Sequence, residues 1–328
     1  MLQTIITFGE ALLRLAPPNH LRLEQARSLD VEVGGAELNT AVGLARLGHS
    51  AAWVSRVPTS PLGDLVRNRV REAGVSDEHV KSVNDGRCGV YFLEQGAAPR
   101  ASAILYDRKD SSISRVTAGE FAWPRIMTGA KWFHVTGITA ALSEGAAAVC
   151  LEAMVAAKAA GLSVSVDLNY RSKLWTAADA GRVMSMLLRH CDVLIASEND
   201  AAQLFNITGK DFAEVAAKLT GRFELNVVAS IRREATQIWH DRIHAVAFSN
   251  GTLLESQPID VEVVDRLGTG DAFAAGLIHG LLNNHLQQGL DTGTAMAALK
   301  HTIVGDLPLM TADEIEAVMT GEGLRIRR

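Results

Sequence analysis

A short stretch near the end of the chain combines residue types that could bind a phosphate and activate a group to attack it. It reads Asp265-Arg266-Leu267-Gly268-Thr269-Gly270-Asp271, between a β-branched run at 261–264 and a long apolar segment at 272–282. These patterns predict a buried strand, a glycine turn and a buried helix in succession. Unpaired N–H groups and the dipole at the helix start would attract an anion, and glycine lets the backbone approach it.

Asp271 needs an explanation, because a carboxylate beside an anion site would repel a phosphate. It could be a general base that takes a proton from a hydroxyl. The backbone N–H groups of Gly268, Thr269 and Gly270 would then hold the phosphate that this hydroxyl attacks. Asp271 could instead simply cap the predicted helix. Gly-x-Gly-Asp alone leaves both interpretations open.

Composition excludes several classes of protein. A chain of 328 residues with 48% hydrophobic and 21% charged residues is ordinary for a soluble enzyme. A net charge of −5 without a basic run argues against a nucleic-acid partner. Cys88, Cys150 and Cys191 lie far apart without metal-ligand spacing, so a reducing cytoplasm is expected and no metal ligands are assigned. We see no signal peptide and no apolar span long enough for a membrane.

Strands and helices alternate along most of the chain, which predicts an α/β fold with a doubly wound, mainly parallel sheet. Runs at 12–33 and 88–116 break this alternation with short strands and turns, so we expect one domain, residues 1–328, with these two segments as a small β-sheet lid. Strands are predicted at 4–8, 51–57, 132–135, 163–168, 193–196 and 226–230, a hairpin at 236–240 and 243–248, and helices at 40–47, 62–73, 143–160, 177–189, 200–205 and 211–220.

Two motifs together resemble those of the ribokinase-like, or PfkB, family of carbohydrate kinases. Gly34-Gly35, followed by Asn39 and Gly48, is similar to the family's N-terminal motif, and the stretch 265–271 is similar to its C-terminal one. Residues 9–15, 167–175 and 300–306 resemble one branch, the 2-keto-3-deoxygluconate kinases. The resemblance implies a ribokinase-like fold, and it favours the general-base interpretation of Asp271. It also implies ATP and Mg²⁺, with K⁺ as a further candidate ion, and a homodimer or higher homo-oligomer formed through the lid.

The resemblance also assigns roles to individual residues. A keto-deoxy sugar acid carries a carboxylate, which an arginine fork would bind, and Arg108 and Arg171 both follow predicted strands. Each could instead be an ordinary surface arginine. Tyr91 and Tyr106 could simply pack within their strands, and Asn39 could simply stabilise its turn. The implied substrate residues are Gly34, Gly35, Asn39, Tyr91, Tyr106, Arg108, Asn169 and Arg171, and the implied nucleotide residues are Ser197, Ser230, Arg232, Gly268, Gly270 and His301.

The chain departs from the family pattern at three places. Thr269 stands where the family usually has alanine, and a glycine usual after the 226–230 strand is replaced within 231–234. An Asn-x-x-Glu motif that the family uses near Mg²⁺ is here Ser197-Glu198-Asn199-Asp200. We therefore expect Mg²⁺ to arrive with the nucleotide and to keep several waters.

The expected function is ATP-dependent phosphorylation of the 6-hydroxyl of 2-keto-3-deoxygluconate, a phosphotransfer to an alcohol. A kinase of the same family for a neutral sugar such as fructose or ribose is one alternative, and a non-catalytic sugar-binding homologue is another. A nicotinamide dehydrogenase would need Gly-x-Gly-x-x-Gly after the first strand, where this chain has Gly9-Glu10-Ala11. The epimer of the sugar acid is not specified by these residues.

Overall fold

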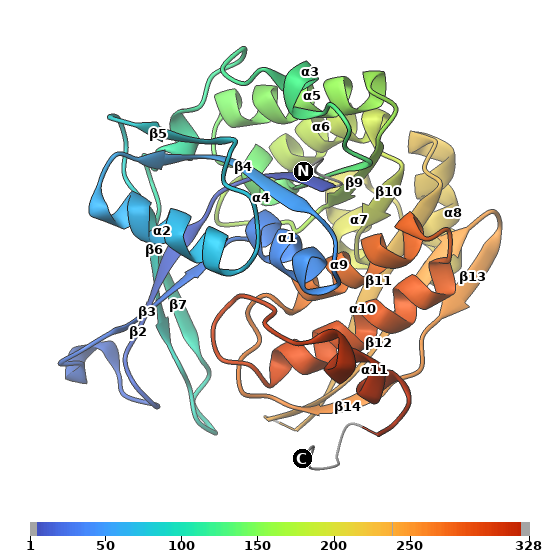
Figure 1. Ribbon diagram of the computed structural model, residues 1–328. Helices are drawn as coiled ribbons and strands as arrows, with labels where there is room; N and C mark the ends of the chain where they lie inside the picture. Colours follow the sequence, from blue (N-terminus) through green and yellow to red (C-terminus); the bar gives the residue numbers. More distant parts are fainter. Residues whose placement is uncertain (1–4, 238, 323–328) are drawn as a thin grey trace.

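A ten-stranded mixed sheet forms the centre of the molecule in the computed structural model, which describes residues 5–237 and 239–322 (Figure 1). Its order is β13-β12-β11-β10-β9-β8-β1-β4-β5, with β14 paired to β12. The strands from β11 to β5 are parallel, and β12 is antiparallel to its neighbours. This confirms the predicted doubly wound, mainly parallel sheet. The strands are β1 (Ile5–Phe8), β4 (Ala51–Pro58), β5 (Val80–Val83), β8 (Trp132–Thr136), β9 (Ser163–Asp167), β10 (Val193–Ile195), β11 (Val227–Gln237), β12 (His240–Ser249), β13 (Thr252–Glu255) and β14 (Ile259–Glu262).

Helices cover both faces of this sheet, because neighbouring residues of its central strands are apolar and point to opposite sides. Ile6 and Phe133 pack with one helical layer, whereas Ile5 and Trp132 pack with the other. The first layer holds α3 (Trp123–Ile126), α5 (Glu144–Ala159), α6 (Ala177–Leu187), α7 (Glu198–Phe205) and α8 (Phe212–Phe223). The second holds α1 (Ala36–Arg46), α2 (Pro61–Glu72), α9 (Thr269–Leu282), α10 (Leu286–His301) and α11 (Ala312–Met319).

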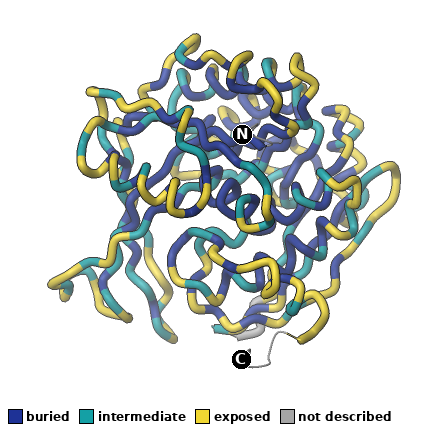
Figure 2. Tube along the Cα trace, viewed as in Figure 1, coloured by how far each residue is buried: buried dark blue, intermediate teal, exposed yellow. Residues whose placement is uncertain are grey.

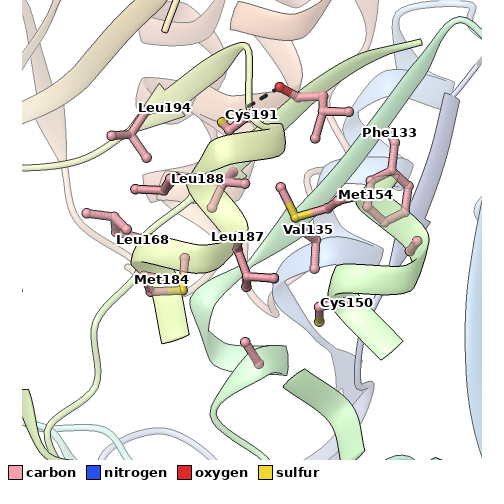
Figure 3. Close-up of a cluster of buried hydrophobic side chains, with 14 of the residues drawn as sticks. Phe133, Val135, Cys150, Met154, Leu168, Met184, Leu187, Leu188, Cys191 and Leu194 are labelled. Carbon is pink, nitrogen blue, oxygen red and sulfur yellow. Dashed lines mark hydrogen bonds between the residues drawn. The ribbon is translucent and has the colours of Figure 1, made fainter. Parts of the chain in front are cut away.

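The first layer shows how closely the core is packed. In Figure 3, Phe133 and Val135 of β8 face Cys150 and Met154 of α5, and side chains of α6 and β10 fill the space beside them. Cys150, Cys191 and Cys88 are all unpaired and buried. Among the described residues, no helix is long and apolar enough to cross a bilayer.

A separate four-stranded sheet stands beside the main body at the lower left of Figure 1, and we call it the lid. It consists of β2 (Leu12–Ala16), β3 (Asp30–Gly34), β6 (Gly89–Glu94) and β7 (Ala103–Asp107), in the order β3-β2-β6-β7. The two outer pairs are antiparallel and the central pair is parallel. Its strands are less buried than those of the main sheet (Figure 2). The predicted small β-sheet insertion is therefore present.

Three strand predictions need correction. The strand predicted at 226–230 continues as β11 to Gln237 and so includes the start of the hairpin arm predicted at 236–240, whereas His240 begins β12. Strand β11 pairs with β12 along most of its length. The strand predicted at 261–264 overlaps β14, which begins at Ile259, ends at Glu262 and pairs with β12. Val261 is buried while Asp260 and Glu262 are exposed, so this strand has one solvent face. The short polar strand β5 was not predicted. Residues 4 and 238, which the predicted strands include, lie outside the described residues.

The sheet topology brings distant segments of the chain together at one edge. Strand β1 lies between β8 and β4. After β1 the main sheet is extended on one side by β4 and β5, and later in the chain it is extended on the other side by β8 and β9. Ligands of open α/β sheets bind at such a reversal, outside the carboxyl ends of the strands. Glu10 follows β1, Ile138 follows β8 and Asn169 follows β9, and all three line a single cavity at this edge.

Candidate active site

The cavity at the reversal of strand order is lined by residues from both glycine motifs, the strand ends and the lid. All four predicted catalytic residues and all eight predicted substrate residues line it: Gly268, Thr269, Gly270, Asp271, Gly34, Gly35, Asn39, Tyr91, Tyr106, Arg108, Asn169 and Arg171. The predicted nucleotide residues Ser197, Ser230, Arg232 and His301 do not line this cavity. The sequence prediction therefore named most of the cavity wall from segments more than 200 residues apart.

Asn39 connects the two glycine motifs. Its Nδ2 donates to Asp271 Oδ2 at 2.7 Å across 232 positions of sequence, and its Oδ1 accepts from the Gly35 N–H at 3.2 Å. One amide therefore orients the carboxylate and also holds the turn before α1, so both interpretations of Asn39 are compatible with its contacts. Helices α1 and α9 pack closely behind this contact, where an added Cβ on Gly43 would lie 2.7 Å from the Ala275 Cβ.

The start of α9 has the geometry of an anion-binding turn. The first intrahelical bond runs from the Ala272 N–H to the Gly268 carbonyl at 2.9 Å. The N–H groups of Thr269, Gly270 and Asp271 precede it and have no partner among the described residues. Gly268 has φ +80°, and a Cβ there would lie 2.0 Å from the Asp306 carbonyl oxygen. Only glycine fits this position, since both its conformation and its surroundings reject a side chain.

Burial sets the protonation of Asp271. Its side chain is buried, and burial raises its pKa from 3.8 to about 7, while the hydrogen bond from Asn39 works in the other direction. The nearby carboxyls of Glu37 and Asp306 raise this pKa further, and the Arg171 guanidinium lowers it. A carboxylate that titrates near neutrality is well matched to take a proton from an alcohol.

Two further carboxyls, the buried Glu37 and the partly buried Asp167, lie near the cavity. Glu37 lines it, and its Oε1 accepts from the Thr136 N–H at 2.9 Å, the Thr136 hydroxyl at 2.8 Å and the Thr139 hydroxyl at 2.7 Å. Burial raises the pKa of Glu37. Burial likewise raises the pKa of Asp167 to about 8, with contributions from Asp271 and Asp200. The inner end of the site therefore has an excess of acidic groups.

The two candidate carboxylate-binding arginines differ in their partners. Arg108 follows β7 and forms an ion pair with Glu10, with 2.9 Å between Arg108 Nε and Glu10 Oε2. Its guanidinium also lies 5.8 Å from the centre of the Tyr106 ring. Arg171 is exposed in the cavity wall, and its guanidinium forms no ion pair or hydrogen bond with any described residue. Arg171 is thus the cavity guanidinium whose donors are open to an anionic ligand.

A buried ionic cluster joins the lid to the anion-binding turn. Arg14 of β2 contacts Asp265 at 2.6 Å and Asp306 at 3.1 Å. The Tyr91 hydroxyl of β6 donates to Asp306 at 2.7 Å, and Asp306 also lines the cavity. An added Cβ on Gly34 would lie 2.3 Å from Asp306 Oδ2. Asp306 therefore touches the lid and both glycine motifs.

The predicted nucleotide residues lie in ordinary structural contacts. Ser197 caps α7 in a reciprocal pair with Asp200, whose Oδ2 accepts from the Ser197 hydroxyl at 2.7 Å. Arg232 forms an ion pair with Glu198. The His301 ring is buried, with Nδ1 2.7 Å from the Ala297 carbonyl oxygen. Ser230 is buried in β11. Their part in nucleotide binding stays a prediction.

Sequence reasoning did not assign site roles to Glu37, Arg266 and Asp306, which line the cavity. Signals for two of them were present, because Glu37 lies two residues after Gly34-Gly35 and Asp306 ends the segment 300–306 noted for its resemblance. Arg266 lies inside the C-terminal motif, but the chemistry predicted from the sequence gave its side chain no role. Its Nε lies 3.4 Å from the buried Asp241 carboxylate.

Comparison with known proteins agrees with this geometry. Residues 2–308 match the model of the pfkB family carbohydrate kinases. The 2-dehydro-3-deoxygalactonokinase of Haloferax volcanii is 39% identical over 329 residues, which cover 100% of both chains. The 2-dehydro-3-deoxygluconokinase of Bacillus subtilis is 27% identical over 97% of this chain and 95% of that protein.

Among solved structures, the 2-dehydro-3-deoxygluconokinase of Thermotoga maritima superposes with a TM-score of 0.94 at 37% identity. That match covers 97% of this chain and 100% of the other. The cavity, the glycine turn beside a carboxylate and these similarities lead to one conclusion. This chain belongs to the PfkB family of carbohydrate kinases, enzymes that transfer a phosphoryl group to a sugar hydroxyl.

Proposed function

We propose that the protein phosphorylates a 2-keto-3-deoxy sugar acid, with 2-keto-3-deoxygluconate as the substrate and 2-keto-3-deoxy-6-phosphogluconate and ADP as the products. One observation carries the proposal: a single cavity contains the Asp271 carboxylate at an anion-binding turn and, on the wall formed after β9, the Arg171 guanidinium, which no described side chain pairs with. A neutral sugar offers such a cation only uncharged hydroxyl and keto oxygens, whereas a carboxylate binds it through stronger, charge-assisted hydrogen bonds.

In the proposed reaction, Asp271 accepts the proton of the substrate's 6-hydroxyl as that oxygen attacks the γ-phosphorus of ATP. The new bond joins O6 to phosphorus, the bond from phosphorus to the β,γ-bridging oxygen breaks, and ADP leaves. N–H groups of Gly268, Thr269 and Gly270 face the charge that develops on the transferred group, as catalysis by positioning and electrostatics requires. Arg171 and Arg108 orient the sugar's carboxylate, and Asn39 holds Asp271 in place.

ATP and Mg²⁺ are the proposed co-substrate and ion. Among the described residues, no group of three His, Cys, Asp or Glu side chains could hold a metal by itself. Burial, and then repulsion from the Asp271 and Asp200 carboxyls, raises the pKa of Asp167, and a cation placed among these carboxyls would relieve that repulsion. We propose that Asp167 and Asp200 bind waters of an Mg²⁺ ion that arrives with the nucleotide and neutralises phosphate charge. The candidate K⁺ stays a prediction, tested by turnover in K⁺ and in tetramethylammonium salts.

We propose further that the chain works as a single catalytic domain, with 12–33 and 88–116 as its lid, and that two lids pack together in a homodimer. The lid exposes large apolar side chains, with Leu105 at 62%, Tyr106 at 45% and Val31 at 42% of their surface. Apolar surface of this kind favours association. Sedimentation analysis should give a dimer for the wild type and a monomer for Leu105→Glu. A cytoplasmic location stays a prediction.

The test of the substrate is a coupled assay for ADP with 2-keto-3-deoxygluconate, its galacto epimer, fructose and ribose. Phosphorus NMR of the product should show a phosphate ester coupled to the two protons at C6. Higher kcat/KM for fructose or ribose would replace the sugar-acid assignment with a neutral-sugar kinase. Binding of a sugar without turnover of any member of the panel would identify a non-catalytic homologue.

A further inference from the structure

Lys300 is a buried cation that the mechanism above does not use. It lies in the last turn of α10, and none of its surface is exposed. Its Nζ donates to the Ile303 carbonyl at 2.7 Å, its one hydrogen-bond partner among the described residues. Burial lowers its pKa, because removing an ammonium from water is costly. A fully buried lysine therefore needs either compensating charges or a function, and its surroundings indicate both.

Lys300 lies against the back of the anion-binding turn. Its Cε is 3.4 Å from the position that a Cβ on Gly268 would take, next to the Asp306 carbonyl. Backbone bonds hold the 264–270 and 301–306 segments together around it. The Val264 and Asp265 N–H groups both donate to the His301 carbonyl, at 2.7 and 2.9 Å, and the Gly305 N–H donates to Asp265 Oδ2 at 3.0 Å.

The charges around Lys300 belong to the site. The carboxylates of Asp265, Asp306 and Asp271 stabilise its ammonium form, and Arg14 opposes it. Arg14 already pairs with Asp265 and Asp306. The catalytic carboxyl of Asp271 is therefore the member of this group without an ion pair among the described residues, and Asn39 is the one described side chain that donates a hydrogen bond to it.

We infer that Lys300 is a positioning residue for phosphoryl transfer, a fixed positive charge behind the anion-binding turn. It holds the segment 264–270 with its N–H groups directed at the incoming phosphate, and it favours the ionised form of Asp271. No covalent step involves it. The inference rests on the proposed roles of Asp271 and of the turn. It does not depend on the identity of the sugar.

The test compares Lys300→Met with wild type, and Lys158→Met serves as the matched control. Lys158 forms its ion pair with Asp192 on the surface, outside the cavity. Methionine fills the buried space without charge, but it leaves the neighbouring carboxylates without this cation, so kcat is calculated per folded molecule, with the folded fraction measured by circular dichroism. We expect kcat to fall roughly 10- to 100-fold in Lys300→Met while KM for the sugar changes less than about threefold. Lys158→Met should match wild type.

A second variant separates charge from packing. Lys300→Ala leaves a cavity, so methylammonium or ethylammonium should restore part of the lost kcat with saturation, whereas tetramethylammonium should not. The pH profile gives an independent readout. Charged groups act on Asp271 from α1 (Glu37), from β9 and the loop after it (Asp167, Arg171), and from α10 and its following loop (Lys300, Asp306). In Lys300→Met, where only this charge is removed, the acidic limb of the kcat/KM profile should move to higher pH by on the order of one pH unit.

Three results would overturn the inference. The first is a Lys300→Met enzyme with kcat within twofold of wild type. The second is a loss of kcat in proportion to the loss of folded protein, measured by circular dichroism. The third is a loss that no alkylammonium restores, together with an unshifted pH profile. If wild type phosphorylates fructose and not the sugar acid, the proposed substrate fails, and the Lys300 comparison is made with fructose instead.

Discussion

Asp271→Asn should nearly abolish turnover and at the same time stabilise the fold. Asparagine cannot accept the substrate proton, so we expect kcat to fall by roughly 10²- to 10⁴-fold. The gain in stability follows from linkage. The folded-state pKa of Asp271 is raised by burial from 3.8 to about 7, so its ionised form is disfavoured in the folded protein. This destabilisation grows as pH rises from the unfolded pKa to the folded one and is constant above it.

The magnitude can be worked from these two pKa values. At about pH 8.5 the full difference applies, and at 1.36 kcal/mol per pH unit it amounts to about 4 kcal/mol as an upper limit. At about pH 5.5 only the interval above 3.8 applies, which is about 2 kcal/mol. The amide also has to re-form the contact with Asn39, so we expect roughly half of each value.

The assay is urea unfolding of both proteins at these two pH values, with Asp64→Asn as the control. Asp64 also lies in the first turn of a helix, α2, but it is exposed. Its substitution should change stability by less than about 1 kcal/mol, with little dependence on pH. Asp271→Asn with turnover within tenfold of wild type, or with a stability change equal at both pH values, would refute the reasoning. In wild type, kcat/KM should rise with pH through about 7.

Two substitutions test the packing of the site. Gly268→Ala should destabilise the fold by roughly 2 to 4 kcal/mol and remove turnover, because φ is +80° and the Asp306 carbonyl oxygen lies 2.0 Å from the position of the new Cβ. The control Gly221→Ala, in open space on α8, should be neutral or slightly stabilising in urea unfolding, and equal effects of the two substitutions would contradict the packing argument. Arg108→Met should lower the free energy of unfolding by roughly 3 kcal/mol, because it leaves the Glu10 carboxylate, 4% exposed, without its partner. Arg87→Met, which breaks an exposed ion pair with Asp107, should lower it by less than about 1 kcal/mol, and similar losses of stability for the two variants in thermal unfolding would contradict the argument from burial.

The sequence predicted those parts of the cavity wall that are formed by residues close together in the chain. The 265–271 stretch contains its glycine turn, its carboxylate and its helix start together, so its geometry could be inferred from residue types. The alternation of strands and helices likewise predicted the parallel sheet, and parallel strands bring their ends to one edge. The cavity wall follows from these two facts.

Contacts between distant segments could not be inferred in this way. Arg108 and Arg171 have the same residue type and both follow a strand, yet Glu10 pairs with Arg108 and no described side chain pairs with Arg171. The length of β11 was missed because its Arg232-Arg233-Glu234 segment is polar, and only pairing with β12 keeps it extended. Lys300 lies one residue before the end of α10, and its complete burial depends on contacts with the turn at Gly268 and with the segment that follows the helix.

The central claim is that a sugar acid is held by Arg171 while Asp271 activates its hydroxyl. The most direct measurement is the ratio of kcat/KM for 2-keto-3-deoxygluconate to that for fructose, in wild type and in Arg171→Met. A charge-assisted hydrogen bond contributes about 1.5 to 3 kcal/mol, so the ratio should fall roughly 10- to 150-fold in the variant, almost entirely through the acid. A ratio below one in wild type, or one that Arg171→Met leaves unchanged, would contradict the account.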